Sequence, residues 1–251
     1  MRRETRVPSQ LVCRPERDLP VAVLRLTGTL DQVTGDALQQ AVRHSIAPQP
    51  SKLLLDVTGL RIGDRHGLAA LSEVVCQTAE WPDVPIVVCG ANQRTARTIA
   101  SAPECANLEY APDCATALAR AGAEPGPPRI RVRLRPVPDA CRQARQLVAQ
   151  ACAVWQRREL TATAALIATE LVANVVRHAH TTMEFTLGLR DGRLSITVRD
   201  GSRRLPEPIE PRPAATGGRG LRLVRDLTDA WGVLPVSDGK VVWTQFPGGA
   251  V

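Results

Sequence analysis

The sequence predicts a chain of mixed class, α/β in its first half and α+β in its second. Three observations predict this division. Strand-like and helix-like segments alternate in the first half, two helical segments precede a run of hairpin strands in the second, and residues 121–128 between them combine small residues with prolines. We therefore expect domains over residues 9–120 and 129–251, joined by a linker over 121–128, which suits a length of 251 residues.

The first half is predicted to form a mixed sheet with helices packed on it. Its strand segments have apolar centres, which is typical of strands buried on both faces. Its helical segments repeat apolar residues every three to four positions, as an amphipathic helix does. The expected strands cover 21–28, 52–57, 85–90 and 108–110, and the expected helices cover 36–44, 64–79, 94–102 and 114–120.

The second half is predicted to form a sandwich, in which helices cover one face of an antiparallel sheet. Asp191-Gly192 between two strand segments predicts a tight hairpin turn. Residues 202–219 contain four prolines and no periodicity, which indicates a loop. The expected strands cover 129–137, 183–190, 193–200, 231–236 and 240–246, and the expected helices cover 138–155, 161–180 and 221–229.

The charge differs between the halves. Residues 1–128 carry a net charge of −1, and residues 129–251 carry +8. A basic half favours an anionic partner, but its arginines are dispersed, no helix-turn-helix pattern is present, and aromatic residues make up only 3% of the chain. We therefore expect no direct binding of nucleic acid and favour a nucleotide or an acidic protein surface.

Several other classes of protein are disfavoured. No uninterrupted apolar run approaches the roughly 18–20 residues that span a bilayer, and no apolar segment follows the basic start, so we expect a cytoplasmic protein without membrane contact. The seven cysteines include no CxxC pair and are expected to be reduced thiols. Neither Lys52 nor Lys240 lies in a P-loop motif, which excludes that class of nucleotide site.

The first candidate site residues lie in the helical segment over 161–180. Glu170 and Asn174 are four residues apart, so they share a helix face at the edge of the apolar stripe. A solvated helix face would also explain this pair. As a site, the amide oxygen of Asn174 suits Mg²⁺, and Glu170 suits a general base near the same phosphates.

Two further candidates follow in the sequence. Asp200-Gly201 stands at the end of a predicted strand. This dipeptide is common in ordinary turns, but the Asp200 carboxylate could instead accept a hydrogen bond from the amino group of a nucleobase. Gly217, Gly218 and Gly220 precede a helix, where backbone amides can bind phosphate. A Rossmann site is disfavoured because Leu223 stands where its third glycine is required. The order of the three elements is more specific than any one of them.

The order of these three elements makes residues 129–251 resemble the GHKL ATPase superfamily, which has the Bergerat fold. Within it, they resemble the bacterial anti-sigma-factor serine/threonine kinases of actinobacterial type. ELVANVVRHA resembles the N box of that family, VRDGS its first glycine box and GGRGLRLV its second. The resemblance implies that Glu170 is the catalytic base, Asn174 a Mg²⁺ ligand, and Asp200 with Gly201 the adenine contact. It also implies that residues 202–217 form a mobile lid over ATP. The residues implied to close over the ATP phosphates are Gly218, Arg219, Gly220 and Leu221, and Thr216 and Gly217 of the lid are also expected to bind the nucleotide.

One position departs from this superfamily pattern. The pattern is DxG, whereas here Gly201 directly follows Asp200 and Ser202 takes the position of the glycine.

The first half resembles the STAS domain of anti-anti-sigma factors over roughly residues 9–120. The resemblance rests on GTLDQVTGDAL and on LLLDVTGLRIGDRHGLAAL. Signalling members have DSSG in the central loop, with the second serine phosphorylated by the partner kinase. Here the loop is Asp64-Arg65-His66-Gly67, which has no serine, so this domain is not expected to accept phosphate at that position. We interpret His66 as a surface residue near a helix start; Thr58 and Ser72 are nearby hydroxyls outside the motif position.

Together the resemblances imply an ATP- and Mg²⁺-dependent serine/threonine protein kinase that regulates transcription by partner switching. Its implied substrate is a separate STAS-type anti-anti-sigma protein, its second implied partner a sigma factor, and its own STAS domain an intramolecular partner. Members of the family often form homodimers through the kinase domain. The alternative is an ATP-binding scaffold with weak catalysis, whose fused STAS domain mediates binding to other proteins.

Overall fold

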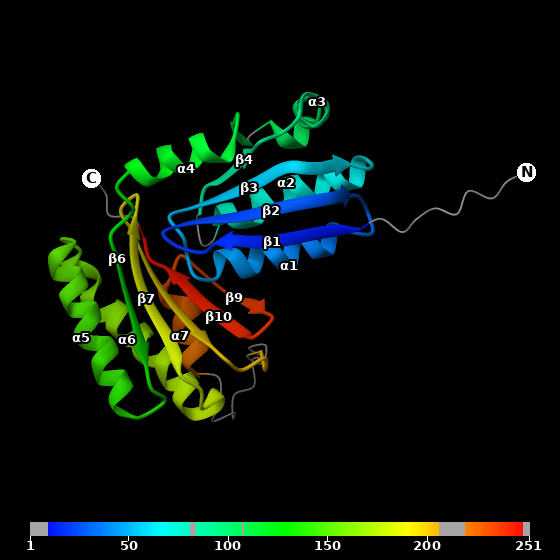
Figure 1. Ribbon diagram of the computed structural model, residues 1–251. Helices are drawn as coiled ribbons and strands as arrows, with labels where there is room; N and C mark the ends of the chain where they lie inside the picture. Colours follow the sequence, from blue (N-terminus) through cyan, green and yellow to red (C-terminus); the bar gives the residue numbers. More distant parts are fainter. Residues whose placement is uncertain (1–9, 81–83, 107, 206–218, 248–251) are drawn as a thin grey trace, which may run out of the picture. The chain divides into compact units, whose positions relative to one another are not determined.

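The computed structural model describes residues 10–80, 84–106, 108–205 and 219–247. The chain divides into two compact units, Met1–Gly126 and Pro127–Val251 (Figure 1). The division lies inside the stretch expected as a linker. That stretch begins too early in the prediction, because residues 121–123 form the last turn of helix α4 (Cys114–Ala123) and Ala121 is buried in the core beneath it.

The first unit contains a mixed five-stranded sheet in the order β1-β2-β3-β4-β5. Strands β2 to β5 are parallel to their neighbours, and β1 is antiparallel to β2. The strands are β1 (Leu11–Arg17), β2 (Val21–Leu30), β3 (Lys52–Ile62), β4 (Ile86–Cys89) and β5 (Glu109–Ala111). The helices are α1 (Gly35–Ile46), α2 (Arg65–Glu80), α3 (Gln93–Ala100) and α4, with a 3₁₀ turn at Pro103–Cys105. This architecture confirms the predicted α/β class of the first half.

Strand β1 is the element of this unit that the sequence pattern did not predict. It lies at the edge of the sheet, most of its residues are exposed, and its pairing with β2 is irregular between Pro15 and Arg17. An edge strand tolerates proline and polar residues because one side of its backbone needs no partner strand. The alternation that marks a half-buried strand is therefore weak here.

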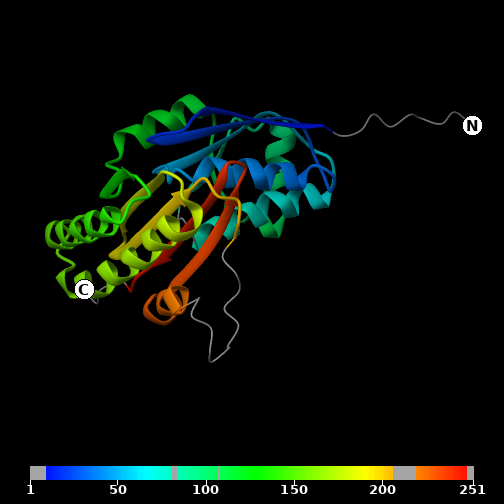
Figure 2. The same cartoon turned by 90° about the horizontal axis from the view of Figure 1, so that it is seen from below.

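Helices cover both faces of this sheet. Helices α1 and α2 pack side by side on one face (Figures 1 and 2). Helix α4 packs on the other, where Ala117 and Ala121 meet Val21, Leu54 and Val87 of the strands. Burial on both faces explains why the centres of β2, β3 and β4 are apolar.

Cys89 and Cys114 form a disulfide, so the prediction that all seven cysteines are reduced thiols is wrong for these two. Cys89 ends β4, and Cys114 is the first residue of α4. The fold brings their Cα atoms to 5.2 Å, which lies within the usual range for a disulfide. The two cysteines are 25 residues apart in the sequence, which matches no cysteine spacing motif, so the sequence did not predict this disulfide.

The second unit contains an antiparallel five-stranded sheet in the order β6-β7-β8-β10-β9. Its strands are β6 (Arg129–Leu134), β7 (Met183–Arg190), β8 (Arg193–Asp200), β9 (Ala230–Val236) and β10 (Gly239–Gln245). Its helices are α5 (Asp139–Val154), α6 (Thr161–Asn174) and α7 (Arg219–Leu227), with short turns at Arg158–Leu160 and Val175–Ala179. Asp191 and Gly192 both have positive φ, as the expected hairpin turn requires.

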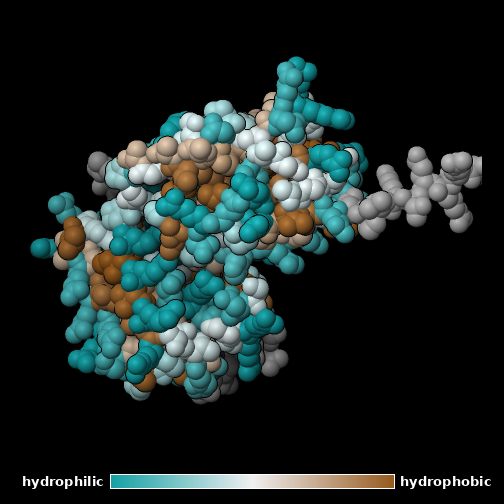
Figure 3. Space-filling view, viewed as in Figure 1, coloured by the Kyte–Doolittle hydropathy of each residue, from teal (hydrophilic) through white to brown (hydrophobic). Residues whose placement is uncertain are grey.

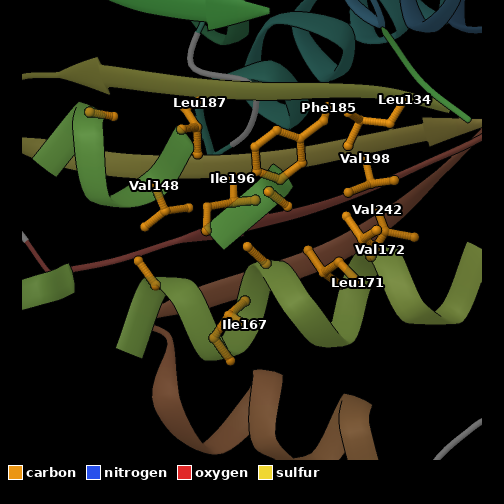
Figure 4. Close-up of a cluster of buried hydrophobic side chains, with 14 of the residues drawn as sticks. Leu134, Val148, Ile167, Leu171, Val172, Phe185, Leu187, Ile196, Val198 and Val242 are labelled. Carbon is orange, nitrogen blue, oxygen red and sulfur yellow. The ribbon is translucent and has the colours of Figure 1, made fainter. Parts of the chain in front are cut away.

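The core of this unit lies between the sheet and helices α5, α6 and α7, which confirms the predicted sandwich. Figure 4 shows Leu171 and Val172 of α6 on the side of the helix that faces the sheet side chains, such as Phe185 and Ile196, whereas Ile167 lies on the side of α6 away from the sheet. All five side chains are at most 2% exposed. Because each strand alternates faces, residues two apart from these core positions also point toward the helices.

The helical segment Arg158–Ala179 is long and apolar enough to cross a membrane by length and composition, with a mean hydropathy of 1.4. Counting uninterrupted apolar runs missed this segment because polar residues such as Glu170 divide it. Its buried residues pack against the sheet, and a core helix meets the same two criteria. On the face shown in Figure 3, apolar residues form separate patches within a mostly hydrophilic surface.

Candidate functional site

Helix α6 places Glu170 and Asn174 one turn apart at its C-terminal end. Leu171 and Val172 between them are buried in the core, which fixes the rotation of the helix about its axis. Glu170 and Asn174 consequently lie at the border of the buried face, and the Glu170 side chain is 24% exposed. This is a position from which a carboxylate and an amide can reach a bound ligand.

The helix changes its winding directly after Asn174. Residues Val175–Ala179 form a π-helical turn, and His180 ends it in the left-handed conformation with φ 55°. The predicted helix over 161–180 is therefore continuous, but only Thr161–Asn174 is α-helical. Single π-helical turns are rare and occur frequently at functional sites.

Asp200 lies at the end of β8 and is 4% exposed. The alternation of β8 places it on the same face as Ile196 and Val198, which is the face covered by α6. Its Oδ1 atom accepts hydrogen bonds from the backbone N–H of Ser202 at 2.7 Å and from Lys240 Nζ at 2.9 Å. The carboxylate is thus held on the side of the sheet where Glu170 and Asn174 lie.

Lys240 is a site residue that the sequence analysis missed. It is buried, and it lies opposite Asp200 in the pairing of β10 with β8. A signal was present in the sequence, because period-two alternation along β10 puts Lys240 on the same face as the core residue Val242. A lysine on the apolar face of a strand predicts a buried charged partner.

The residues after Asp200 follow a defined path. The Gly201 N–H donates to Thr181 Oγ1 at 3.0 Å, and the Ser202 carbonyl oxygen accepts from Lys240 Nζ at 3.2 Å. Ser202 is not among the residues with positive φ, so its backbone conformation does not require glycine. The departure from the DxG pattern at Ser202 therefore causes no backbone strain here.

Helix α7 brings Gly220 against Glu170. A Cβ atom placed on Gly220 would lie 2.5 Å from Glu170 Oε2, so a larger residue here would force the end of the Glu170 side chain to move. Leu221 packs against the core of the unit and fixes the first turn of α7. Arg219 is the first residue of the helix, whereas Thr216, Gly217 and Gly218 lie outside the described residues.

One arginine lies close to the Glu170 carboxylate, and a second is hydrogen-bonded to the preceding residue, Thr169. Arg177 Nη2 lies 3.7 Å from Glu170 Oε2, and Arg145 Nη1 donates to Thr169 Oγ1 at 3.4 Å. Nearby, burial raises the pKa of the Cys141 thiol; Arg145 and Arg177 oppose this rise and Glu170 adds to it. Arg177 therefore places a positive charge close to the Glu170 carboxylate.

In the first unit, the loop over residues 64–67 forms the start of α2. Asp64 Oδ1 accepts a hydrogen bond from the Gly67 N–H at 2.9 Å, and His66 Nδ1 lies 3.8 Å from Asp64 Oδ2. The nearby hydroxyl of Thr58 donates to Asp56 at 2.6 Å, and Ser72 is 8% exposed. The hydrogen bond to Asp56 gives the Thr58 hydroxyl a structural explanation, and Ser72 is buried.

Among the described residues, no group of three or more His, Cys, Asp or Glu side chains could hold a metal ion. A cation held by one amide oxygen and by phosphate oxygens of a ligand needs no such group.

Two family models match the chain. The model of the histidine kinase-like ATPase domain matches residues 134–246, and the model of the Mlab-type STAS domain matches residues 13–102. The chain is a STAS domain joined to a histidine kinase-like ATPase domain. This confirms the two domain types that the motifs predicted, and the two units are called the STAS unit and the ATPase unit below.

Several solved structures are similar to one part of the chain. An anti-sigma factor antagonist from Mycobacterium paratuberculosis is 24% identical over 46% of this chain and 97% of its own, with a TM-score of 0.40. The RsbU and RsbW domains of a Mycobacterium tuberculosis protein are 18% identical over 50% of this chain and 35% of theirs, with a TM-score of 0.38. No curated protein matches the sequence.

A third solved structure is similar to a larger share of the chain. The histidine kinase domain of a blue-light activated histidine kinase from Erythrobacter litoralis is 15% identical over 86% of this chain and 93% of its own, with a TM-score of 0.31.

Proposed function

We propose that this chain is an ATP-dependent serine/threonine protein kinase of the anti-sigma-factor type, which phosphorylates a separate STAS-domain protein. The observation that carries the proposal is the close approach of Gly220 to Glu170 Oε2. This approach places the glycine box, which is expected to bind the phosphates, next to Glu170, the candidate base on α6. Asn174, one turn further along α6, completes a site for a phosphate chain and its cation.

The residues present fit a nucleotide and Mg²⁺. Gly220 leaves space beside Glu170 that a larger side chain would fill. The amide oxygen of Asn174 is a hard donor of the kind that Mg²⁺ takes, and Asp200 offers a buried carboxylate to a base amino group. Bound Mg²⁺ supplies positive charge that neutralises the phosphates during transfer.

In this proposal Glu170 accepts the proton of the substrate hydroxyl as the hydroxyl oxygen forms a bond to the terminal phosphorus of ATP. The bond from that phosphorus to the bridging oxygen breaks, and ADP leaves. The carboxylate is partly exposed, so an incoming hydroxyl group can reach it. Arg177, 3.7 Å away, orients the carboxylate. Positioning and charge stabilisation supply most of the rate in phosphoryl transfer, so the fixed geometry of α6 and α7 matters more than the strength of the base.

The phosphate acceptor is proposed to be a serine or threonine on another STAS protein. The loop Asp64-Arg65-His66-Gly67 of the STAS unit carries no hydroxyl at the position of the expected serine. Transfer within the chain to a serine or threonine of that loop is thereby excluded. We propose that the ATPase unit also binds a sigma factor until the unphosphorylated STAS partner displaces it, and that the protein works in the cytoplasm.

One observation favours a second candidate, a nucleotide-dependent scaffold without efficient catalysis. A covalently attached STAS unit without an acceptor serine suits a permanent binding partner better than a substrate. The two candidates agree on ATP binding and differ in whether phosphate is transferred.

The deciding experiment measures ATP binding and transfer of labelled phosphate, with Mg²⁺, to a panel of serine-containing STAS proteins from the same genome. The full chain is compared with Glu170→Ala and Asn174→Ala. Glu184→Ala is the matched control, since Glu184 forms an ion pair with Arg131 on the opposite face of the sheet. Transfer to one partner that is lost in Glu170→Ala while ATP still binds supports the kinase. Binding without transfer supports the scaffold, and absence of binding contradicts both.

A further inference from the structure

Lys240 carries a positive charge into the interior of the ATPase unit. Its side chain is 10% exposed, and that of Asp200, its direct neighbour across the β8–β10 ladder, is 1% exposed. A buried ammonium group is unfavourable unless it is paired and hydrogen-bonded. Lys240 Nζ meets that requirement by donating to Asp200 Oδ1 at 2.9 Å and to the Ser202 carbonyl oxygen at 3.2 Å.

These contacts fix the orientation of the Asp200 carboxylate. Oδ1 accepts from both Lys240 Nζ and the Ser202 N–H, and within the described part of the chain every hydrogen bond to this carboxylate is made to Oδ1. Two donors on one oxygen hold the side-chain torsion in place. Oδ2 is left to accept a hydrogen bond from a ligand.

A purely structural function explains this pair poorly. Buried ion pairs contribute little to stability, because apolar residues of similar volume often serve as well. The neighbouring positions on the same strand faces, Val198 and Val242, are in fact apolar. A charged pair at the end of β8 that includes Asp200, the predicted contact to the base, is therefore better explained by recognition.

We propose that Lys240 is a positioning residue for the nucleobase, which makes the site selective for a 6-aminopurine. The inference rests on the proposed nucleotide-binding function and deepens it. Asp200 Oδ2 accepts from the 6-amino group of adenine, and the ammonium beside it faces the ring nitrogen acceptor next to that group. A 6-oxopurine presents the reverse order of acceptor and donor, so its 6-oxygen meets the carboxylate unfavourably.

The test compares binding of ATP and of inosine triphosphate, each with Mg²⁺, to the full chain and to Lys240→Met and Lys240→Arg. The wild type is expected to prefer ATP by at least about tenfold, since a site built for hydrogen bonds rejects a ligand that leaves them unmade. Lys240→Met is expected to lower both ATP affinity and this preference several-fold, and Lys240→Arg to restore part of the preference.

Lys52→Met is the matched control, because Lys52 is the other lysine of the chain and pairs with Glu124 in the STAS unit. Lys240→Met leaves a buried carboxylate without its partner, so the double variant Lys240→Met/Asp200→Asn is included to preserve the fold, which is monitored by thermal unfolding. It is expected to fold and to lack the preference for ATP.

The outcomes separate the two proposals. If the wild type binds ATP, and a folded Lys240→Met variant keeps the same affinity and the same preference over inosine triphosphate, Lys240 is only structural and the inference is wrong. If the wild type binds neither nucleotide, the proposed function itself fails and the inference fails with it.

Discussion

Gly220 has no side chain, and this lets the glycine box approach Glu170, the candidate base. The space beside Gly220 is occupied by the Glu170 carboxylate, at 2.5 Å from where a Cβ would lie. Gly220→Ala should therefore displace the carboxylate and lower phosphoryl transfer at least about tenfold, because small misplacements of catalytic groups are costly. Transfer rate and ATP affinity are to be measured separately, with affinity expected to change less than the rate.

Gly122→Ala provides the control for this substitution. Gly122 lies in α4, and a Cβ there would contact nothing within 4 Å. Alanine in a helix is more favourable than glycine by about 0.5–1 kcal/mol, so this variant should be slightly more stable and fully active. Equal transfer rates for the two glycine variants would refute the role given to Gly220.

Asp56 links the stability of the STAS unit to pH. Burial raises the pKa of this carboxyl group, but the hydrogen bonds from Thr58 and Arg25 outweigh burial, and the net pKa is lowered. A lowered pKa stabilises the fold above the pKa of the unfolded chain, about 3.9, and this contribution is lost as the pH falls through the folded value. Stability should therefore decrease below about pH 4, and less so in Asp56→Asn.

Hydrogen exchange of the β3 amides between pH 3 and 6, corrected for the intrinsic exchange rate, measures this effect within the STAS unit. Asp18→Asn is the control, since Asp18 is exposed. If wild type and Asp56→Asn lost protection in parallel, Asp56 would not be the group responsible.

At the scale of elements, the Cys89–Cys114 disulfide joins the end of β4 to the start of α4. The denatured, unreduced protein should expose five thiols of its seven cysteines. Cys114→Ser should expose six, because Cys89 is released, and should lower the stability of the unit by about 2–4 kcal/mol. Thiol titration and urea unfolding provide these two readouts.

Cys76→Ser is the matched control for this variant, because Cys76 is exposed and forms no disulfide. It should expose four thiols and unfold like the wild type. Seven reactive thiols in the wild-type protein would show that the two cysteines are not joined in solution.

At the scale of the whole molecule, a short connection between two units gives each a millimolar effective concentration near the other. The division at Gly126 and Pro127 places the connection between α4 and β6. We predict that the STAS unit regulates the ATPase unit, so that cleavage at a protease site inserted after Gly126 changes the rate of transfer to a partner at least about threefold. Equal rates before and after cleavage of the folded protein would contradict this.

The local patterns of the sequence predicted most of the fold. Strand and helix positions agree with the structure to within a few residues where an element is strongly periodic, as in β7, β8 and α5. The prediction failed where the sequence pattern is weak and where two partner residues lie far apart in the sequence. The edge strand β1 carries little alternation, and the partners Cys89 and Cys114 are 25 residues apart.

The same distinction between local pattern and long-range contact applies to the candidate site. The sequence by itself determined which side chains are available, namely Glu170 and Asn174 on one helix face and Asp200 at a strand end, because these depend on spacing within one element. Only the tertiary structure decided that Gly220 meets Glu170 and that Lys240 pairs with Asp200. Such contacts join residues 40 or more positions apart, and packing of the whole unit rather than local periodicity brings them together.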